Sequence, residues 1–343
     1  MLRPKAFLVV FAVLTLPAAP RGADVPHALP PALDTFLSEA VRASAADRDA
    51  LTSGQPLVKL LDSDPAKEVA VFGAVWIDAT PAAYVTAISD IERFERGDAI
   101  DVTKRIGNPA SPSDFAAMSM TDEDFGDLKN CQVGDCALKV DERSLHSFRT
   151  VVDWRKPTAR ADADAVIRRL ALEYVNRYRE GGNATLAVYR DKQRPTFVAD
   201  EFRSMIERLP RLGSEMPDVT AYLLNYPQSS LANSTDFIYW QEARFGLKPI
   251  VRVNHLVIQT RPDCTVVASK LLYASHYFWT ALELRVLLPD PSRARGFWFV
   301  MVNRGRSDGL SGFTGSVIRG RVRGELQKGM SRLLAATKSQ LES

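Results

Sequence analysis

Residues 250–288 read IVRVNHLVIQTRPDCTVVASKLLYASHYFWTALELRVLL. The stretch consists of runs rich in β-branched and aromatic residues, at 250–259, 265–273 and 277–288, separated by short turns such as Arg261-Pro-Asp263. Residues of the first kind favour strands, whereas Pro and Asp favour turns. Strands joined by such short turns pair antiparallel, because a parallel crossover needs a dozen or more residues. The stretch therefore predicts consecutive antiparallel strands.

The same pattern continues on both sides of this stretch. Residues 237–245 and 297–303 are further β-rich runs, and a long helix is expected from there to the C-terminus. The apolar stripe of this helix comprises Ile318, Val322, Leu326, Met330, Leu333 or Leu334, and Leu341. The helix also contains residues that weaken it, namely Gly312, Gly315, Gly320, Gly324 and Gly329. These glycines indicate either close approach of a sheet or ligand to the helix backbone, or a frayed first half.

An earlier β-rich run, EVAVFGAVWI, occupies residues 68–77. Thr80-Pro81 follows it, and because Thr can cap a helix and Pro suits the first helical position, a helix is predicted to begin there and to end near Gly97. The remaining pattern predicts helices at 31–42, 45–51, 161–179 and 197–209, short strands at 137–140 and 186–189, and a loop with short helices at 105–130.

Residues 1–23 combine a basic start, a short apolar run and a small-residue end. This is the pattern of a cleaved secretory signal peptide, since the apolar run has about 11 residues and a bilayer span needs ~20. A membrane anchor or a buried helix is the alternative. The segment contains Arg3, Lys5 and Arg21 and no acid, so its removal takes the net charge from +3 to 0. Neutrality argues against nucleic acid as a partner, and the signal predicts a periplasmic or secreted protein.

The front and the back of the predicted fold carry a family resemblance. At the front, the run at 69–77 is followed by the helix at 81–92. At the back, the matching residues are Ala274-Ser-His-Tyr-Phe-Trp279, Val302-Asn-Arg304 and the segment from Leu310 through Gly315 to Leu341. This order of elements resembles the START-like, or Bet v 1-like, helix-grip superfamily, also called SRPBCC.

The resemblance implies an α+β fold in which a curved antiparallel β-sheet grips the long C-terminal helix. The START-like domain would span 66–343, with extra helices inserted at about 105–230, and a helical segment at 24–65 would precede it. In this superfamily the sheet and the C-terminal helix enclose a hydrophobic cavity for lipids or other apolar molecules. By analogy of fold, the resemblance implies a binding or carrier protein for an apolar, lipid-class ligand. We expect a monomer that uses no cofactor.

Cys131 and Cys136 are separated by Gln-Val-Gly-Asp, and Cys264 lies far from both in the sequence. In an oxidising compartment, a local disulfide that closes a turn around Gly134 is expected. Free thiols and a metal-binding pair are the alternatives, and the metal pair is the weakest because no second pair or His cluster lies nearby. No metal site is therefore predicted.

His276 is the titratable residue that the pattern singles out. In the run at 277–288 the even positions from 282 onward are apolar, and alternation assigns them to the covered face of the sheet. Continued backwards without a bulge, the alternation places His276 on that face. His276 would then be a candidate acid/base with Glu283 or Glu242 as its carboxylate. A hydrogen-bonded structural histidine is the alternative.

Aromatic residues are frequent in the same strands. A ligand pocket lined by Trp240, Tyr273, His276, Tyr277 and Phe299 is one interpretation, and ordinary core packing is the other. His255 lies on a predicted strand between Asn254 and Leu256, where a structural histidine is expected.

The sequence alone leaves several functions open. The first is an exported carrier of an apolar ligand, the second is a cyclase- or hydrolase-like enzyme that uses His276, and the third is an envelope protein that docks a partner through residues 105–230. A peripheral contact with an anionic membrane is also predicted from a basic C-terminal segment, although a solvated helix face is the alternative. The segment carries Arg304, Arg306, Arg319, Arg321, Arg323, Lys328 and Arg332 against Asp308 and Glu325.

Overall fold

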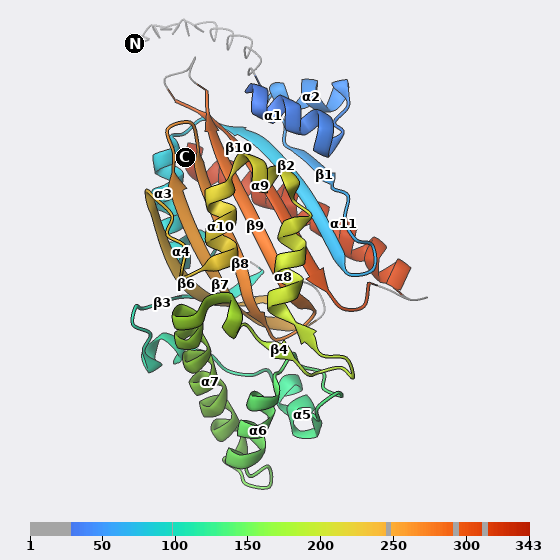
Figure 1. Ribbon diagram of the computed structural model, residues 1–343, viewed down its shortest axis with the longest axis vertical. Coiled ribbons are helices and arrows are strands. Elements are labelled where there is room, and N and C mark those ends of the chain that lie inside the picture. Colours follow the sequence, from blue (N-terminus) through green and yellow to red (C-terminus); the bar gives the residue numbers. More distant parts are fainter. Residues whose placement is uncertain (1–28, 98, 245–247, 291–294, 311–314) are drawn as a thin grey trace, which may run out of the picture.

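The computed structural model describes residues 29–97, 99–244, 248–290, 295–310 and 315–343. The predicted signal peptide at 1–23 lies outside the described residues, as does Gly312. The fold is α+β, with a curved, open, eight-stranded antiparallel sheet that grips a long C-terminal helix and carries extra helices inserted along the chain (Figure 1). The predicted fold class is confirmed.

The strands of the sheet follow the order β1-β2-β10-β9-β8-β7-β6-β3, and every neighbouring pair is antiparallel. Their bounds are β1 Leu57–Leu60, β2 Glu68–Ile77, β3 Ile100–Ile106, β6 Ser234–Arg244, β7 Pro249–Thr260, β8 Thr265–Ala274, β9 Phe278–Pro289 and β10 Phe297–Ser307. A separate ladder pairs β4, Val188–Tyr189, with β5, Thr196–Phe197.

These strands confirm every β-rich run predicted from 237 onward and the run at 68–77. The prediction missed β3 and also β1, which lies in the segment 24–65 predicted as helical, and it was wrong at 137–140, which is not a strand. It also ended β10 too early, since this strand continues to Ser307 and the C-terminal helix begins only at Gly315.

The helices include the predicted ones with small shifts in their ends. Their bounds are α1 Pro31–Phe36, α2 Ala45–Thr52, α3 Pro81–Ser89, α4 Ile91–Phe94, α5 Asp122–Asn130, α6 Glu142–Val151, α7 Ala159–Gly181, α8 Val198–Glu207, α9 Pro210–Glu215, α10 Pro217–Asn225 and α11 Gly315–Glu342. A π-helical turn, η1 Leu37–Val41, continues α1, and short 3₁₀ turns lie at η2, Pro112–Phe115, and η3, Gly182–Thr185. At the start of α3, the Thr80 hydroxyl accepts a hydrogen bond from the Ala83 amide at 3.1 Å, as a capping residue should.

All ten residues of β2 are buried, so both faces of the sheet are covered at this strand. Ala70, Phe72 and Trp76 point to what we call the outer face, where they pack with α1, α2, α8 and α10. Val71 and Val75 point to the inner face, where they pack with α3 and α11. Figure 1 shows α8, α9 and α10 on one side of the sheet and α11 on the other.

Helix α11 approaches β2 closely at a glycine of the strand. A Cβ placed on Gly73 would lie 2.8 Å from Met330 Cγ and 3.0 Å from a methyl carbon of Leu334. By contrast, a Cβ on Gly320, Gly324 or Gly329 would meet nothing within 4 Å. Close approach to the helix backbone was one of the two interpretations of the helix glycines, and at these three positions it is not seen, whereas the strand provides a close contact at Gly73.

The inserted region lies on the outer face and at one end of the sheet. Residues of α7 pack against β6, β7 and β8 through a cluster that includes Tyr178, Trp240 and Val253. The helices α5 and α6 and much of α7 extend beyond that end of the sheet (Figure 1). The insertion is thus a second cover for the sheet.

Replacing Gly73 with Val is expected to lower the free energy of unfolding by about 1–3 kcal/mol, because the new side chain overpacks the contact with α11. Gly324→Ala, on the open side of the same helix, is the control and is expected to stabilise the protein by about 0.5–1 kcal/mol. Urea denaturation of both variants measures the two effects. A neutral Gly73→Val would contradict the packing of α11 on β2.

Candidate functional site

A cavity of about 80 Å³ lies between the inserted helices and the outer face of the sheet. Its floor consists of Val251 and Val253 from β7 and Tyr273 from β8. Leu170, Ala171, Tyr174 and Arg177 of α7 form one wall, and the remaining lining comes from α6, residues 139–141, Met118 and Ala187. The cavity is therefore bounded by segments that are far apart in the sequence.

The tyrosines of the cavity are held by hydrogen bonds to backbone carbonyl groups. The Tyr273 hydroxyl donates to the carbonyl of Lys139 at 3.0 Å, and the Tyr174 hydroxyl donates to the carbonyl of Leu272 at 2.7 Å. Burial raises the pKa of both hydroxyls above their ordinary value. Both tyrosines are consequently neutral at physiological pH, and their rings meet edge to face with centroids 6.2 Å apart.

Lys139 fastens the wall formed by residues 139–141. Its Nζ is paired with Asp191 at 2.8 Å and also with Asp308, and its side chain is only 3% exposed. Asp308 accepts a further hydrogen bond from the indole of Trp279. Because removal of either partner of a buried pair is costly, these contacts fix the wall to the sheet and to the segment before α11.

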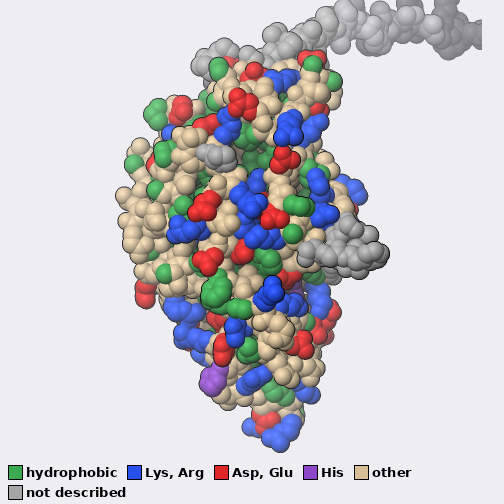
Figure 2. All heavy atoms as spheres, turned by 45° about the vertical axis from the view of Figure 1, so that its right-hand side comes forward, with side chains coloured by type: hydrophobic (Ala, Val, Ile, Leu, Met, Phe, Trp, Pro, Cys, Tyr) green, Lys and Arg blue, Asp and Glu red, His purple; other side chains and the backbone are tan. Residues whose placement is uncertain are grey.

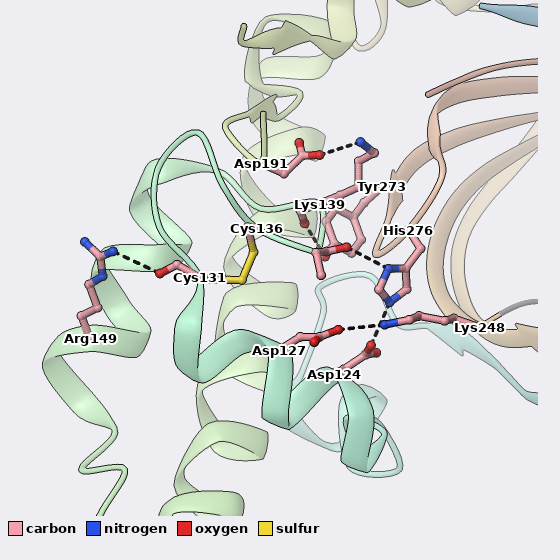
Figure 3. Close-up of a disulfide and its surroundings, with 11 residues drawn as sticks. Asp124, Asp127, Cys131, Cys136, Lys139, Arg149, Asp191, Lys248, Tyr273 and His276 are labelled. Carbon is pink, nitrogen blue, oxygen red and sulfur yellow. Dashed lines mark hydrogen bonds and ion pairs between the residues drawn. A yellow bond between two sulfur atoms is a disulfide. The ribbon is translucent and has the colours of Figure 1, made fainter. Parts of the chain in front are cut away.

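The disulfide lies behind the same wall. Cys131 and Cys136 are bonded, with their Cα atoms 4.5 Å apart, and the turn between them contains Gly134 at φ +87°. Figure 3 shows this turn beside Lys139 and Tyr273, with Asp124 and Asp127 on the helix that precedes it. Among the alternatives that the sequence left open, the structure has the disulfide.

His276 joins this turn to the sheet. Its Nε2 lies 2.9 Å from Oδ1 of Asp124, and its Nδ1 lies 3.2 Å from the carbonyl oxygen of Ala137 (Figure 3). The residue is 3% exposed and does not line the cavity. Both ring nitrogens are engaged within the protein, so neither is free for a substrate, and the contacts are those of a structural histidine.

The carboxylates predicted as partners of His276 lie elsewhere. Glu283 is on the inner face of β9, where it bonds Arg285 at 2.9 Å. Glu242 is partly buried on β6, and this burial raises its pKa. The predicted catalytic set is therefore not brought together. Alternation fails here because β8 ends at Ala274 and β9 begins at Phe278, with Tyr277 at φ +60° in the turn between them.

The predicted pocket aromatics are divided between the two faces of the sheet. Trp240 is buried on the outer face and donates from its indole to the carbonyl of Asp114 at 2.8 Å. Phe299 is buried on the inner face, 5.2 Å from the ring of Tyr84. Tyr277 accepts a hydrogen bond from the Lys248 amide at 2.8 Å. Of the predicted ligand-binding set, only Tyr273 lines the described cavity.

A network of buried charges, which the sequence did not predict, lies on the inner face. Arg285 is 3% exposed, and it bonds Glu283 and, at 3.2 Å, Glu95 at the end of α4. Gln241 donates to Glu95 at 2.7 Å and accepts from Arg252 at 2.8 Å. Alternation assigned only the even positions of this strand to a covered face, whereas the inner face, on which Glu283 and Arg285 lie, is covered as well. The only sequence signal for this network was the presence of charged residues inside a run of β-branched residues.

Two arginines of the predicted basic C-terminal segment are not on the helix. Arg304 and Arg306 lie buried on β10, where both bond the fully buried Glu68, and Arg306 also bonds Glu201 at 2.7 Å. Helix α11 does expose basic side chains, including Lys328, which pairs with Glu325 at 3.1 Å. On the face seen in Figure 2, Lys and Arg side chains are interspersed with Asp and Glu.

Comparisons of the chain with protein-family models, with curated proteins and with solved structures found no match. None of the described helices has a stretch long and apolar enough to span a bilayer. Within the described residues, no group of three or more His, Cys, Asp or Glu side chains is arranged to hold a metal ion.

Asp124→Ala is expected to lower the free energy of unfolding by about 1–3 kcal/mol, because it removes the buried hydrogen bond of His276. Asp127→Ala, one turn further along α5, is the matched control. Its partner Lys248 is partly exposed and also pairs with Glu123 at 2.7 Å, so a loss below about 1 kcal/mol is expected. Thermal unfolding compares the variants, and equal losses would contradict a structural role for His276.

Proposed function

We propose that this protein is a START-like binding protein that takes up a small, mainly apolar molecule. Support for the START-like assignment comes from the order of elements: β2, then α3 and α4, then antiparallel strands that return to pair with β2, and finally α11. This is the order on which the resemblance rests, and fold analogy connects it to ligand binding.

The observation that carries the proposal is the cavity below α7. Val251, Val253, Leu170 and Ala171 contribute apolar side chains to its lining, together with the neutral Tyr174 and Tyr273, and polar residues that include Asp141, Arg143 and Arg177 also line it. Sites of this kind are mostly apolar with a few placed polar groups. We assign the ligand to this cavity rather than to the space between the sheet and α11, where the resemblance alone would place it.

The size of the cavity limits the ligand. Pockets for drug-sized molecules measure about 300–1,000 Å³, whereas this cavity measures about 80 Å³. A single aromatic ring or the end of one acyl chain is of suitable size, and a whole diacyl lipid is not. The proposal is therefore narrower than the lipid-class ligand expected from the sequence.

One polar group at the cavity wall lacks a hydrogen bond. Nη1 of Arg177 is buried without a hydrogen-bond partner, and its nearest carboxylate, on Glu173, is 3.9 Å away. A buried donor of this kind is stabilised by an acceptor. We therefore expect the ligand to carry one oxygen atom, such as a carbonyl or hydroxyl group, at its end nearest α7.

Export to the periplasm or beyond the cell is part of the proposal. The Cys131–Cys136 disulfide supports it, because such bonds persist mainly in oxidising compartments. The amino-terminal sequence of the protein isolated from its own cells tests this part. Loss of residues 1–23 is the expected result, and a chain that begins at Met1 would contradict it.

Partner docking through the inserted region is a second candidate. The described large apolar side chains with the greatest exposure are Val133, Val151 and Phe197, and all of them lie in this region. Exposed apolar groups of this kind favour protein contacts when they are contiguous. Co-purification of a partner that is lost in a triple Ser variant of these residues would support this candidate.

Ala171→Leu is expected to weaken binding of benzene or indole at least tenfold, because the larger side chain fills the cavity. Each buried methylene group contributes about 0.8 kcal/mol, so the folded protein should be no less stable. Ala161→Leu is the control, since Ala161 is exposed on the same helix. Chemical-shift titration with each probe measures the affinity, and unchanged binding in Ala171→Leu would contradict the assigned site.

A further inference from the structure

The outer face of the sheet contains a second buried polar cluster, next to the cavity but not part of it. His255 of β7 and Lys270 of β8 are cross-strand partners in register. They are 3% and 0% exposed, respectively. The inserted region covers them through Tyr178 of α7, Asn183 of η3 and Phe202 of α8.

Lys270 is a buried amine without a counter-ion. Its Nζ donates to Oδ1 of Asn183 and lies 4.2 Å from the ring centroid of Phe202 and 5.3 Å from that of Tyr178. No carboxylate among the described residues forms an ion pair with it. An ammonium group has three donors and one charge to satisfy, so this environment suits the neutral amine, and burial lowers the pKa of Lys270 to about 7.

His255 is satisfied as a neutral ring. Its Nε2 donates to Oδ2 of Asp236 at 2.8 Å, and its Nδ1 accepts from the Tyr178 hydroxyl at 3.0 Å. The Tyr222 hydroxyl lies 3.4 Å from Nε2. Burial lowers the pKa of His255, Asp236 opposes this shift, and the positive charges of Lys270 and Arg179 add to it. Protonation of His255 would therefore place a cation beside Lys270, which is itself protonated below about pH 7.

Few charges in the cluster can compensate for added protons. Lys270, His255 and Arg179 are basic, and Asp236, which is 42% exposed at its side chain, is the acid that faces them. The other titratable groups that face the cluster are Tyr178, Tyr222 and Tyr226, and burial raises the pKa of each, so they remain neutral. Acidification thus brings positive charges together in a covered site.

The cluster also lies at the contact between the sheet and the inserted region. His255, Lys270 and Asp236 belong to the sheet, whereas Tyr178 belongs to α7. Tyr174, one helical turn before Tyr178, lines the cavity. The same helix therefore closes the cavity and covers the titratable groups.

We propose that His255, Lys270 and Tyr178 form a pH-sensitive contact between α7 and the sheet, which we call the latch. Acidification weakens this contact, so that α7 moves away from the sheet and the neighbouring cavity opens. The pH-dependent opening of α7 is inferred from the buried cluster alone. Its effect on a ligand rests on the function proposed above. Because the folded protein holds fewer protons on these groups than the unfolded chain, closure of the latch strengthens as the pH rises.

The pKa values of Lys270 and His255 set the pH range over which the latch opens. An unperturbed lysine has a pKa near 10.4, so the contribution of Lys270 to closure increases from about pH 7 to about pH 10. The contribution of His255 is lost as the pH falls below its ordinary value of about 6.5. A difference of one bound proton changes the opening constant about tenfold for each pH unit.

Hydrogen exchange of the full chain tests the proposal. After correction for the intrinsic exchange rate, opening of residues 159–181 should increase about tenfold for each pH unit from pH 9 to pH 7 in the wild-type protein. Lys270→Met should largely abolish this dependence. Lys104→Met, which alters a half-exposed strand lysine paired with Glu92, should leave it unchanged.

Protection of α7 that is independent of pH, or an unchanged slope in Lys270→Met, would overturn the latch. If Lys270→Met does not fold, urea denaturation of the wild-type protein is the second measurement, and a stability that does not rise between pH 7 and pH 9 would overturn it. Benzene binding separates the two proposals. A pH-dependent opening of α7 without benzene binding at any pH would reject the proposed function and retain the latch.

Discussion

The apolar character of both faces of the sheet is the constraint on which the rest of the structure depends. An antiparallel sheet commonly leaves one face to water, whereas β2 is buried along its whole length. Helix α11 packs on β1 and β2 at one edge of the inner face, and α4 packs on β3 at the other. The outer face needs a cover of its own, which the N-terminal helices and the inserted region provide. The cavity lies between the inserted region and the outer face of the sheet.

Buried charges hold the cover of the outer face in place. Glu68 binds Arg304 and Arg306, and Lys139 binds Asp191 and Asp308. Each group joins segments that are far apart in the sequence, and each cation has a carboxylate partner, which is the condition under which buried charge is tolerated. Lys270 departs from this rule, since its hydrogen-bond partner is a neutral amide. Because Lys270 lacks a carboxylate partner, we expect the contact between α7 and the sheet to respond to pH, whereas the two paired groups should not.

Much of the fold could be predicted because its signals are local. The run at 68–77, the Thr80 cap and the turns between the later strands are each read from neighbouring residues, and the structure has them within a few positions. β3 was missed because its residues Ile-Asp-Val-Thr-Lys-Arg-Ile form a polar edge strand that pairs with β6, more than a hundred residues later. The candidate site was predicted less well. Tyr273 does line the cavity, but alternation could not show that Phe299 faces the other way, or that the partner of His276 is Asp124 on the inserted α5.

We propose that apolar molecules bind beneath α7, on the outer face of the sheet. Xenon occupies apolar cavities of this order of size, and its anomalous scattering locates it in crystals pressurised with the gas. A xenon peak in van der Waals contact with Tyr174 and Tyr273 is expected. A peak on the inner face between α11 and the sheet, with none beneath α7, would show that the ligand site lies elsewhere.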